Sequence, residues 1–200
     1  MIAALTGMGL SAAAGLNAYI PFLVVALVAR FTDLITLPAG YTWIESNWAI
    51  GIGAVLLLTE VALDKVPGVD TVNDTIQTVI RPMMGGLIFA ATTAASELDN
   101  STWMADNPWA PVALGIVVSG IVHTGKMAAR PVVNVGTAGL GGPVVSTVED
   151  GASFGLSLIA IIAPVLVIVA LALLAWLLIW MALRVRRRRS SGAAPAYPSS

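Results

Sequence analysis

Two short polar segments carry the residues of this chain that could do chemistry. The first segment holds Glu60, Asp64, Lys65, Asp70, Asp74 and Arg81. The second segment holds Lys126, Arg130, Asn134, Ser146, Glu149 and Asp150. Carboxylates and cations set in apolar surroundings can line a path for a small solute or an ion, and they can equally form a salt-bridge lattice that joins helices. Spacing alone favours neither use.

Catalysis and metal binding find no support in these spacings. His123 is the only histidine and there is no cysteine, which removes thiol chemistry, zinc–thiolate sites and disulfides. We find no nucleophile–base spacing and no metal-ligand motif. We therefore predict no catalytic residue, no metal and no cofactor, and we expect the protein not to be an enzyme. His123 is better explained as a hydrogen-bonded residue between helices.

Glu60 is the most informative of the candidates. It lies four residues before Asp64, so the two carboxylates share one face of a helix. It also follows an apolar stretch that starts near Trp48. An ionised group inside a membrane is costly and then faces a helix bundle or a cavity. A carboxylate at the membrane interface that reaches water is the alternative. For Asp64 and Lys65 a solvated helix end is the simpler interpretation.

The second segment has a structural alternative of its own. The run Ser146-Thr-Val-Glu149 matches the capping box that opens many helices. Asp150 would then lie in the first turn, where the helix dipole favours a carboxylate. The sequence leaves both this role and a role in a solute pathway open.

The composition predicts that a lipid bilayer surrounds these segments. Of the 200 residues, 58% are hydrophobic and only 10% are charged, whereas a soluble domain carries roughly 25% charged residues. The mean hydropathy is +0.89. The formal net charge is −1, which argues against a nucleic-acid partner. We expect lipid, a small solute or ion, and further copies of the chain as partners.

The apolar stretches predict an all-α, polytopic membrane protein with about five transmembrane helices, or six in the alternative arrangement. They cover residues 1–29, 46–63, 82–96, 107–125 and 152–183. Asn17 and Pro21 interrupt the first stretch. The last one would be about 48 Å long as one helix, against about 30 Å of hydrocarbon, so we expect a break at Pro164. The sequence thus predicts broken or re-entrant segments.

An internal repeat is the second long-range pattern. Residues 48–84 align with residues 109–145 at an offset of 61, with matches at Trp48/Trp109, Lys65/Lys126, Asn73/Asn134 and Pro82/Pro143. In each copy a tryptophan starts a helix, a lysine ends it and a proline precedes the next helix. Repeats of this kind occur in transporters. We place both copies in one transmembrane domain, residues 1–189.

An arginine cluster predicts the orientation. Arg184, Arg186, Arg187, Arg188 and Arg189 follow the last apolar stretch and should remain cytoplasmic, with residues 190–200 as a disordered cytoplasmic tail. With five crossings, residues 97–108 share that side, and residues 64–82 and 125–150 lie opposite. In the alternative, Lys65, Arg81, Lys126 and Arg130 are cytoplasmic and residues 131–148 form a sixth crossing.

Three segments carry a family resemblance. They are GLNAYIP, DKVPGVDTVNDTIQTVIRP and NVGTAGLGGPVVSTVEDG. They resemble the small bacterial membrane proteins grouped as domain of unknown function 4126, from about Gly9 to Leu183. One departure is Asn17-Ala18-Tyr19, where we associate the family with an arginine–aromatic pair. The resemblance implies a multi-pass protein of the bacterial cytoplasmic (inner) membrane and supplies no activity.

Three functions are compatible with the sequence. The leading hypothesis is a small-solute or ion transporter or channel, because charged and broken segments repeat within an apolar helical chain. The first alternative is a non-catalytic membrane subunit or scaffold that partners another complex. A membrane-embedded enzyme is the second alternative, and it has the least support.

Overall fold

The chain folds as a bundle of helices. The computed structural model describes residues 2–64, 69–95, 107–136 and 141–191, and in these ranges it contains helices and no strand. The elements are α1 (Ile2–Leu16), α2 (Tyr19–Phe31), the 3-10 helix η1 (Thr42–Glu45), α3 (Asn47–Leu63), α4 (Val69–Ala95), α6 (Trp109–Gly136), α7 (Gly141–Ile162) and α8 (Leu166–Ser191). The predicted all-α class is confirmed.

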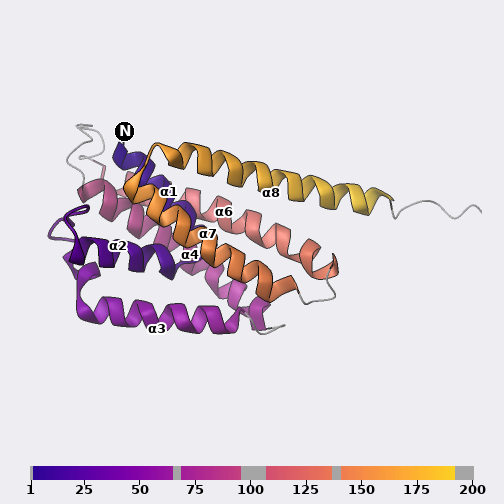
Figure 1. Cartoon of the computed structure of the whole chain (residues 1–200), viewed down its shortest axis with the longest axis horizontal. Coiled ribbons are helices and arrows are strands. Elements are labelled where there is room, and N and C mark those ends of the chain that lie inside the picture. Colours follow the sequence, from indigo (N-terminus) through magenta and orange to yellow (C-terminus); the bar gives the residue numbers. More distant parts are fainter. Residues whose placement is uncertain (1, 65–68, 96–106, 137–140, 192–200) are drawn as a thin grey trace, which may run out of the picture.

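Five of these helices run along the long axis of the bundle (Figure 1). They are α3, α4, α6, α7 and α8, and each of them reverses the direction of the one before it. The closest pairing is between α4 and α6, where a side chain on Gly86 would lie 2.9 Å from the carbonyl of Val112. Small residues allow this close approach of two backbones.

The first two helices are short and form a hairpin inside the bundle. α1 has 15 residues and α2 has 13, and the chain leaves the helical path at Asn17 and Ala18. The side-chain oxygen of Asn17 accepts the backbone N–H groups of Tyr19 and Ile20 at 3.0 and 3.1 Å. These are donors of the first turn of α2, which have no partner within the helix. The expected interruption at Asn17 is confirmed.

The tip of this hairpin lies midway along the bundle. The hydroxyl of Ser153 donates to the carbonyl of Ala13 at 2.9 Å, and the guanidinium of Arg81 donates to the carbonyl of Gly15 at 3.4 Å. Arg81 is near the middle of α4, and Ser153 is near the middle of α7. The break between α1 and α2 is therefore enclosed by the centres of longer helices.

The expected break at Pro164 is confirmed, but its consequence was not foreseen. α7 ends at Ile162, α8 begins at Leu166, and the chain turns back on itself between them (Figure 1). The reversal adds one pass along the bundle. As a result α6 and α8 run in the same direction, and the start of α6 lies opposite the arginine-bearing end of α8. Most of residues 97–108, which we placed on the side of the arginines, lie outside the described residues, so that placement stays a prediction.

The helix boundaries correct three local predictions. Pro82 lies inside α4 rather than before a helix. Lys126 lies inside α6, which continues to Gly136 instead of ending near the lysine. α7 already begins at Gly141, so Ser146 and Glu149 lie within the helix and form no capping box at its start. Residues 141–151, which include three glycines, are helical.

The two copies of the predicted repeat start alike and then differ. Trp48 and Trp109 both lie in the first turn of a helix, α3 and α6 respectively. α3 ends at Leu63, whereas α6 runs on past the aligned position 124. Ser190 and Ser191, which we assigned to the tail, are the last residues of α8. The rest of that tail lies outside the described residues.

Two described segments are long and apolar enough to cross a bilayer, namely Trp109–Ala128 and Gly142–Ile162. Large apolar side chains are also exposed on the outside of the bundle, such as Val55 at 63% and Trp176 at 63%. The interior contains many polar side chains, and Arg81 has no exposed surface at all. The described bundle thus exposes large apolar side chains and buries charged ones beside an apolar core that includes Leu10, Ile44 and Ile88.

Candidate functional site

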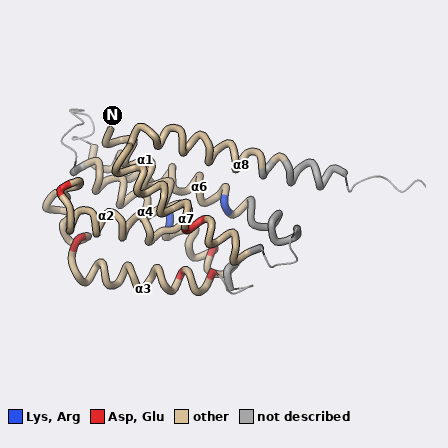
Figure 2. Tube along the Cα trace, viewed as in Figure 1, with Lys and Arg blue, Asp and Glu red and all other residues tan. Residues whose placement is uncertain are grey.

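The structure brings the two polar segments together into one cluster around the tip of the α1–α2 hairpin. In Figure 2 the red and blue positions of α3, α4, α6 and α7 gather in one part of the bundle, apart from the charged positions near the connection between α2 and α3. We define the polar cluster by nine residues, which are Asn17, Glu60, Asp64, Asp74, Arg81, Lys126, Ser146, Glu149 and Asp150. All except Asn17 were predicted from the sequence.

Glu60 and Arg81 form the most deeply buried ion pair of the cluster. Oε1 of Glu60 accepts from Nη2 of Arg81 at 2.6 Å, and the two side chains are 1% and 0% exposed. The other oxygen of Glu60 and Nε of Arg81 have no hydrogen-bond partner within the described residues. A buried pair with unused polar atoms stabilises a fold poorly.

Lys126 of α6 contacts α1, α4, α7 and Asp64, the residue that follows α3. Its ammonium lies 2.9 Å from Oε2 of Glu149, 3.9 Å from Oδ1 of Asp74 and 4.0 Å from Oδ2 of Asp64. It also donates to the carbonyl of Leu16 at 3.2 Å. This carbonyl is at the end of α1, where the helix dipole favours a positive charge.

Neutral side chains hold the carboxylates in place. Nδ2 of Asn73 donates to Oδ1 of Asp64 at 2.8 Å, and the hydroxyl of Ser146 donates to Oδ2 of the same residue at 3.4 Å. Nδ2 of Asn17 donates to Oδ1 of Asp150 at 2.9 Å. Asn17 therefore satisfies the first turn of α2 with its oxygen and a carboxylate of α7 with its nitrogen.

Sequence reasoning missed part of this arrangement. Asn17 was recognised only as an interruption and as a departure from the family pattern. Asn73 was noticed only as a repeat match, and Gln77, which is 3% exposed, was not singled out. An amide inside an apolar stretch was the available signal. The prediction for His123 is confirmed, since its Nε2 lies 3.1 Å from the hydroxyl of Thr78 across the α4–α6 contact.

Several predicted residues cannot be placed in the cluster. Lys65 lies outside the described residues. Asp70 is on α4, and Arg130 and Asn134 are on α6, but their side chains lie outside the description. The same is true of the side chains of Arg184, Arg186, Arg187, Arg188 and Arg189 on α8.

The described cluster contains more acidic than basic side chains. Five carboxylates, those of Glu60, Asp64, Asp74, Glu149 and Asp150, lie with two cations, Arg81 and Lys126. Within the described residues no group of three histidine, cysteine or acidic side chains is placed to hold a metal ion.

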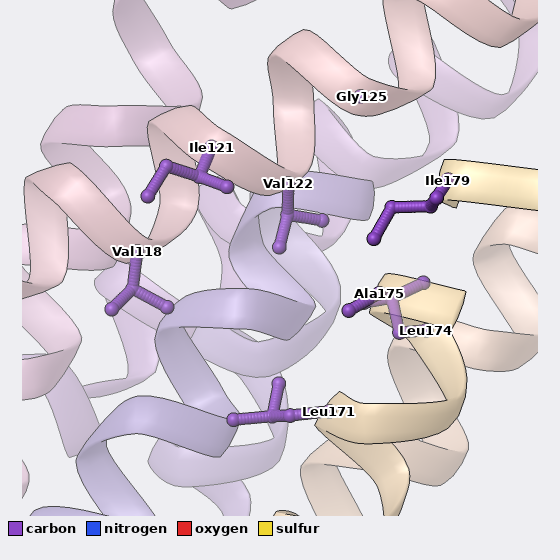
Figure 3. A pocket seen from close by; sticks show the side chains of 8 residues that line it. All are labelled: Val118, Ile121, Val122, Gly125, Leu171, Leu174, Ala175 and Ile179. Atoms are coloured by element: carbon purple, nitrogen blue, oxygen red, sulfur yellow. The ribbon is translucent and has the colours of Figure 1, made fainter. Parts of the chain in front are cut away.

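A separate groove on the outside of the bundle is apolar. It lies between α6 and α8, has a volume of about 490 Å³, and is lined by Val118, Ile121, Val122, Gly125, Leu171, Leu174, Ala175 and Ile179 (Figure 3). The labelled side chains of the two helices approach one another across it without a polar group. It has no connection to the chemistry of the cluster.

Comparison with known proteins gives a family and nothing narrower. No curated protein and no solved structure matches the chain. One family model does match, and it covers residues 4–184 of the 200-residue chain. That range includes every residue of the polar cluster. The chain belongs to the family described as Domain of unknown function (DUF4126).

Proposed function

We propose that this protein is a polytopic membrane protein of the bacterial cytoplasmic membrane. In this proposal α3, α4, α6, α7 and α8 cross the bilayer, and the α1–α2 hairpin enters from one side and returns. The support is the exposed apolar surface of the long helices, the burial of charge inside the bundle and the mean hydropathy of +0.89. Irregular backbone at membrane depth is tolerated where protein surrounds it, as at Asn17.

The proposed orientation puts the arginine-bearing end of α8 in the cytoplasm. The end of α3, the start of α4, the end of α6 and the start of α7 are at that same end of the bundle (Figure 1). Lys65 and Arg130 belong to these parts of the chain. The positive-inside rule is then satisfied with five crossings, without the sixth that the alternative arrangement assigned to residues 131–148.

We further propose that the protein transports a small solute or an ion through the polar cluster. The observation that supports this most is the buried pair of Glu60 and Arg81, which lies at a helix break in the middle of the bundle. Ionisable residues at membrane depth mark solute pathways and proton relays. Broken helices that meet at the midplane are the usual place for such sites in transporters.

Flux measurements on reconstituted protein test this proposal. Proteoliposomes with the wild type should take up at least one of a panel of protons, alkali cations, amines and metabolites faster than protein-free vesicles. Glu60→Gln should lower that flux at least tenfold. Asp33→Asn is the matched control, because Asp33 is an exposed carboxylate outside the cluster. Wild-type vesicles that are as tight as protein-free ones toward the whole panel would contradict transport.

A further inference from the structure

The outer groove between α6 and α8 has no role in the polar cluster. Its volume is about 490 Å³, and its eight lining residues are all apolar or glycine (Figure 3). On α6 they extend from Val118 to Gly125, and on α8 they extend from Leu171 to Ile179. At 1.5 Å per residue these stretches are about 10–12 Å long. The groove is therefore an elongated apolar site that follows two helices.

Arginines lie beyond one end of this groove. α6 and α8 run in the same direction, so Gly125 and Ile179 mark the same end of it (Figure 1). Five residues further along the backbone, α6 has Arg130 and α8 has Arg184, a rise of about 7–8 Å in each helix. α8 then continues with the four arginines of residues 186–189. The sequences of the two helices contain no acidic residue that would offset this positive charge.

An apolar groove that ends near cations matches the two parts of an anionic phospholipid. In the proposed membrane placement, the arginine-bearing ends of both helices lie at the cytoplasmic leaflet. One leaflet contains about 15 Å of hydrocarbon, which is close to the length of the groove. Trp176 and Trp180, whose ring centroids are 6.5 Å apart, lie on either side of Ile179 in the sequence. Tryptophan is enriched at the level of the headgroups, and anionic headgroups attract basic residues beside a helix end.

A second copy of the chain matches this surface less well. Copies in one membrane have the same orientation, so pairing across α6 and α8 would bring two arginine clusters together. Like charges placed opposite each other oppose association. An uncharged lipid has no advantage either, because lipid tails surround the whole protein and gain little from an apolar surface. The charge of the headgroup is therefore the property that selects the occupant.

We propose that the groove between α6 and α8 binds one acyl chain of an anionic phospholipid, with the headgroup at the arginine-bearing ends of the two helices. The groove then determines where the lipid lies, and the arginines determine its preference for negative charge. This inference rests on the proposed membrane placement of α6 and α8. It does not depend on transport through the polar cluster.

Thermal unfolding of the wild type in an uncharged detergent tests the site. Phosphatidylglycerol should raise Tm saturably, by about 3–6 °C at ten times its dissociation constant. Phosphatidylcholine with the same acyl chains should require at least about a fivefold higher concentration for the same shift. Inorganic phosphate at equal concentration should leave Tm unchanged, because it has no acyl chain. Equal effects of the two lipids, no effect of either, or an equal effect of phosphate alone would overturn the proposal.

Variants that fill the groove separate it from a general attraction of lipid to arginine. Ala175→Trp on α8 and Ile121→Trp on α6 each add bulk to one wall of the groove and retain every arginine. Each should abolish the Tm shift with phosphatidylglycerol. Val55→Trp, at an exposed position of α3, is the matched control and should keep the shift. A full shift in both groove variants would overturn the groove as the binding site.

A second pair of variants tests the contribution of charge. Arg130→Gln combined with Arg184→Gln removes two cations and leaves the lining of the groove intact. The double variant should require at least about a fivefold higher concentration of phosphatidylglycerol for the same shift. Arg30→Gln, which removes an exposed arginine of α2, should respond as the wild type does. An unchanged response of the double variant would contradict the assignment of the headgroup.

Native mass spectrometry of the wild type gives a result that requires no variant to fold. From an equimolar mixture the protein should retain at least about fivefold more phosphatidylglycerol than phosphatidylcholine, and equal retention would overturn the site. Failure of the lipid site would leave the transport proposal standing, because flux is measured separately. Selective retention of phosphatidylglycerol without flux of any solute would support the lipid site and contradict transport alone.

Discussion

Because Glu60 and Arg81 form a buried ion pair, replacing one of them should destabilise the protein more than replacing the other. Glu60→Met and Arg81→Met each remove one partner of the pair and retain side-chain length. The guanidinium left by Glu60→Met stays charged in a site with no exposed surface. The carboxylate left by Arg81→Met can become neutral by binding a proton. Glu60→Met should therefore be the more destabilising of the two.

The magnitude follows from the burial of the pair. Leaving one partner of a buried ion pair charged and alone costs about 3–5 kcal/mol. For a chain of this size about 1 kcal/mol corresponds to about 2–4 °C in Tm, so Glu60→Met should lower Tm by about 6–20 °C. The double variant removes both charges, and its loss should be smaller than the sum of the single losses by about 0.5–3 kcal/mol.

Thermal unfolding of the purified protein in detergent, followed by the fluorescence of its six tryptophans, measures all three variants. Asp33→Met serves as the control, because this exposed carboxylate lies outside the polar cluster. The reasoning fails if both single variants shift Tm by less than about 2 °C and their effects simply add. It also fails if Arg81→Met is the more destabilising substitution.

Two further substitutions test the packing around the cluster. Asn17→Leu removes the acceptor for the backbone N–H groups of Tyr19 and Ile20 and the donor to Asp150. It should lower the free energy of unfolding by at least about 1–2 kcal/mol. A Tm equal to that of the wild type would contradict the role of Asn17 at the break between α1 and α2. Gly115→Leu would force α4 and α6 apart, because even a Cβ atom would lie 2.7 Å from Cβ of Phe89, and it should cost about 1–3 kcal/mol. Gly51→Leu is the control, because a side chain there meets open space on α3, and it should leave Tm within about 2 °C of the wild type. An equal loss of Tm in Gly115→Leu and Gly51→Leu would contradict the close packing of α4 against α6.

Some of the fold could be predicted because the causes are local. Proline has no N–H to donate, so Pro164 indicated where the long apolar stretch ends its first helix. Asn17 stood out as an amide in an apolar run. The same rule gave a wrong prediction at Pro82, which lies within α4. Neighbouring helices can supply partners for the backbone groups that a proline leaves without one. Local rules locate a break, but they do not decide whether the chain bends or reverses there.

The sequence predicted most residues of the candidate site, but it did not predict which of them contact one another. Both polar segments were identified, yet nothing in the sequence relates Asp64 to Ser146, which are 82 residues apart and hydrogen-bonded. Their contact depends on how α3 packs against α2 and α4 and how α7 packs against α1 and α2. The carbonyls of Gly15 and Leu16 were also unforeseen, because backbone acceptors at a helix end become available only where the helix actually stops.

Labelling of single cysteines tests the central claim most directly, namely that the polar cluster lies inside a bundle that crosses the membrane. The chain has no native cysteine. With a membrane-impermeant maleimide, Asp33→Cys and Asn107→Cys should react in intact cells, and Val144→Cys and Ser191→Cys only after permeabilisation. Glu149→Cys should resist the reagent in both conditions. Reaction of Asp33→Cys and Ser191→Cys from the same side, together with ready labelling of Glu149→Cys, would contradict the account.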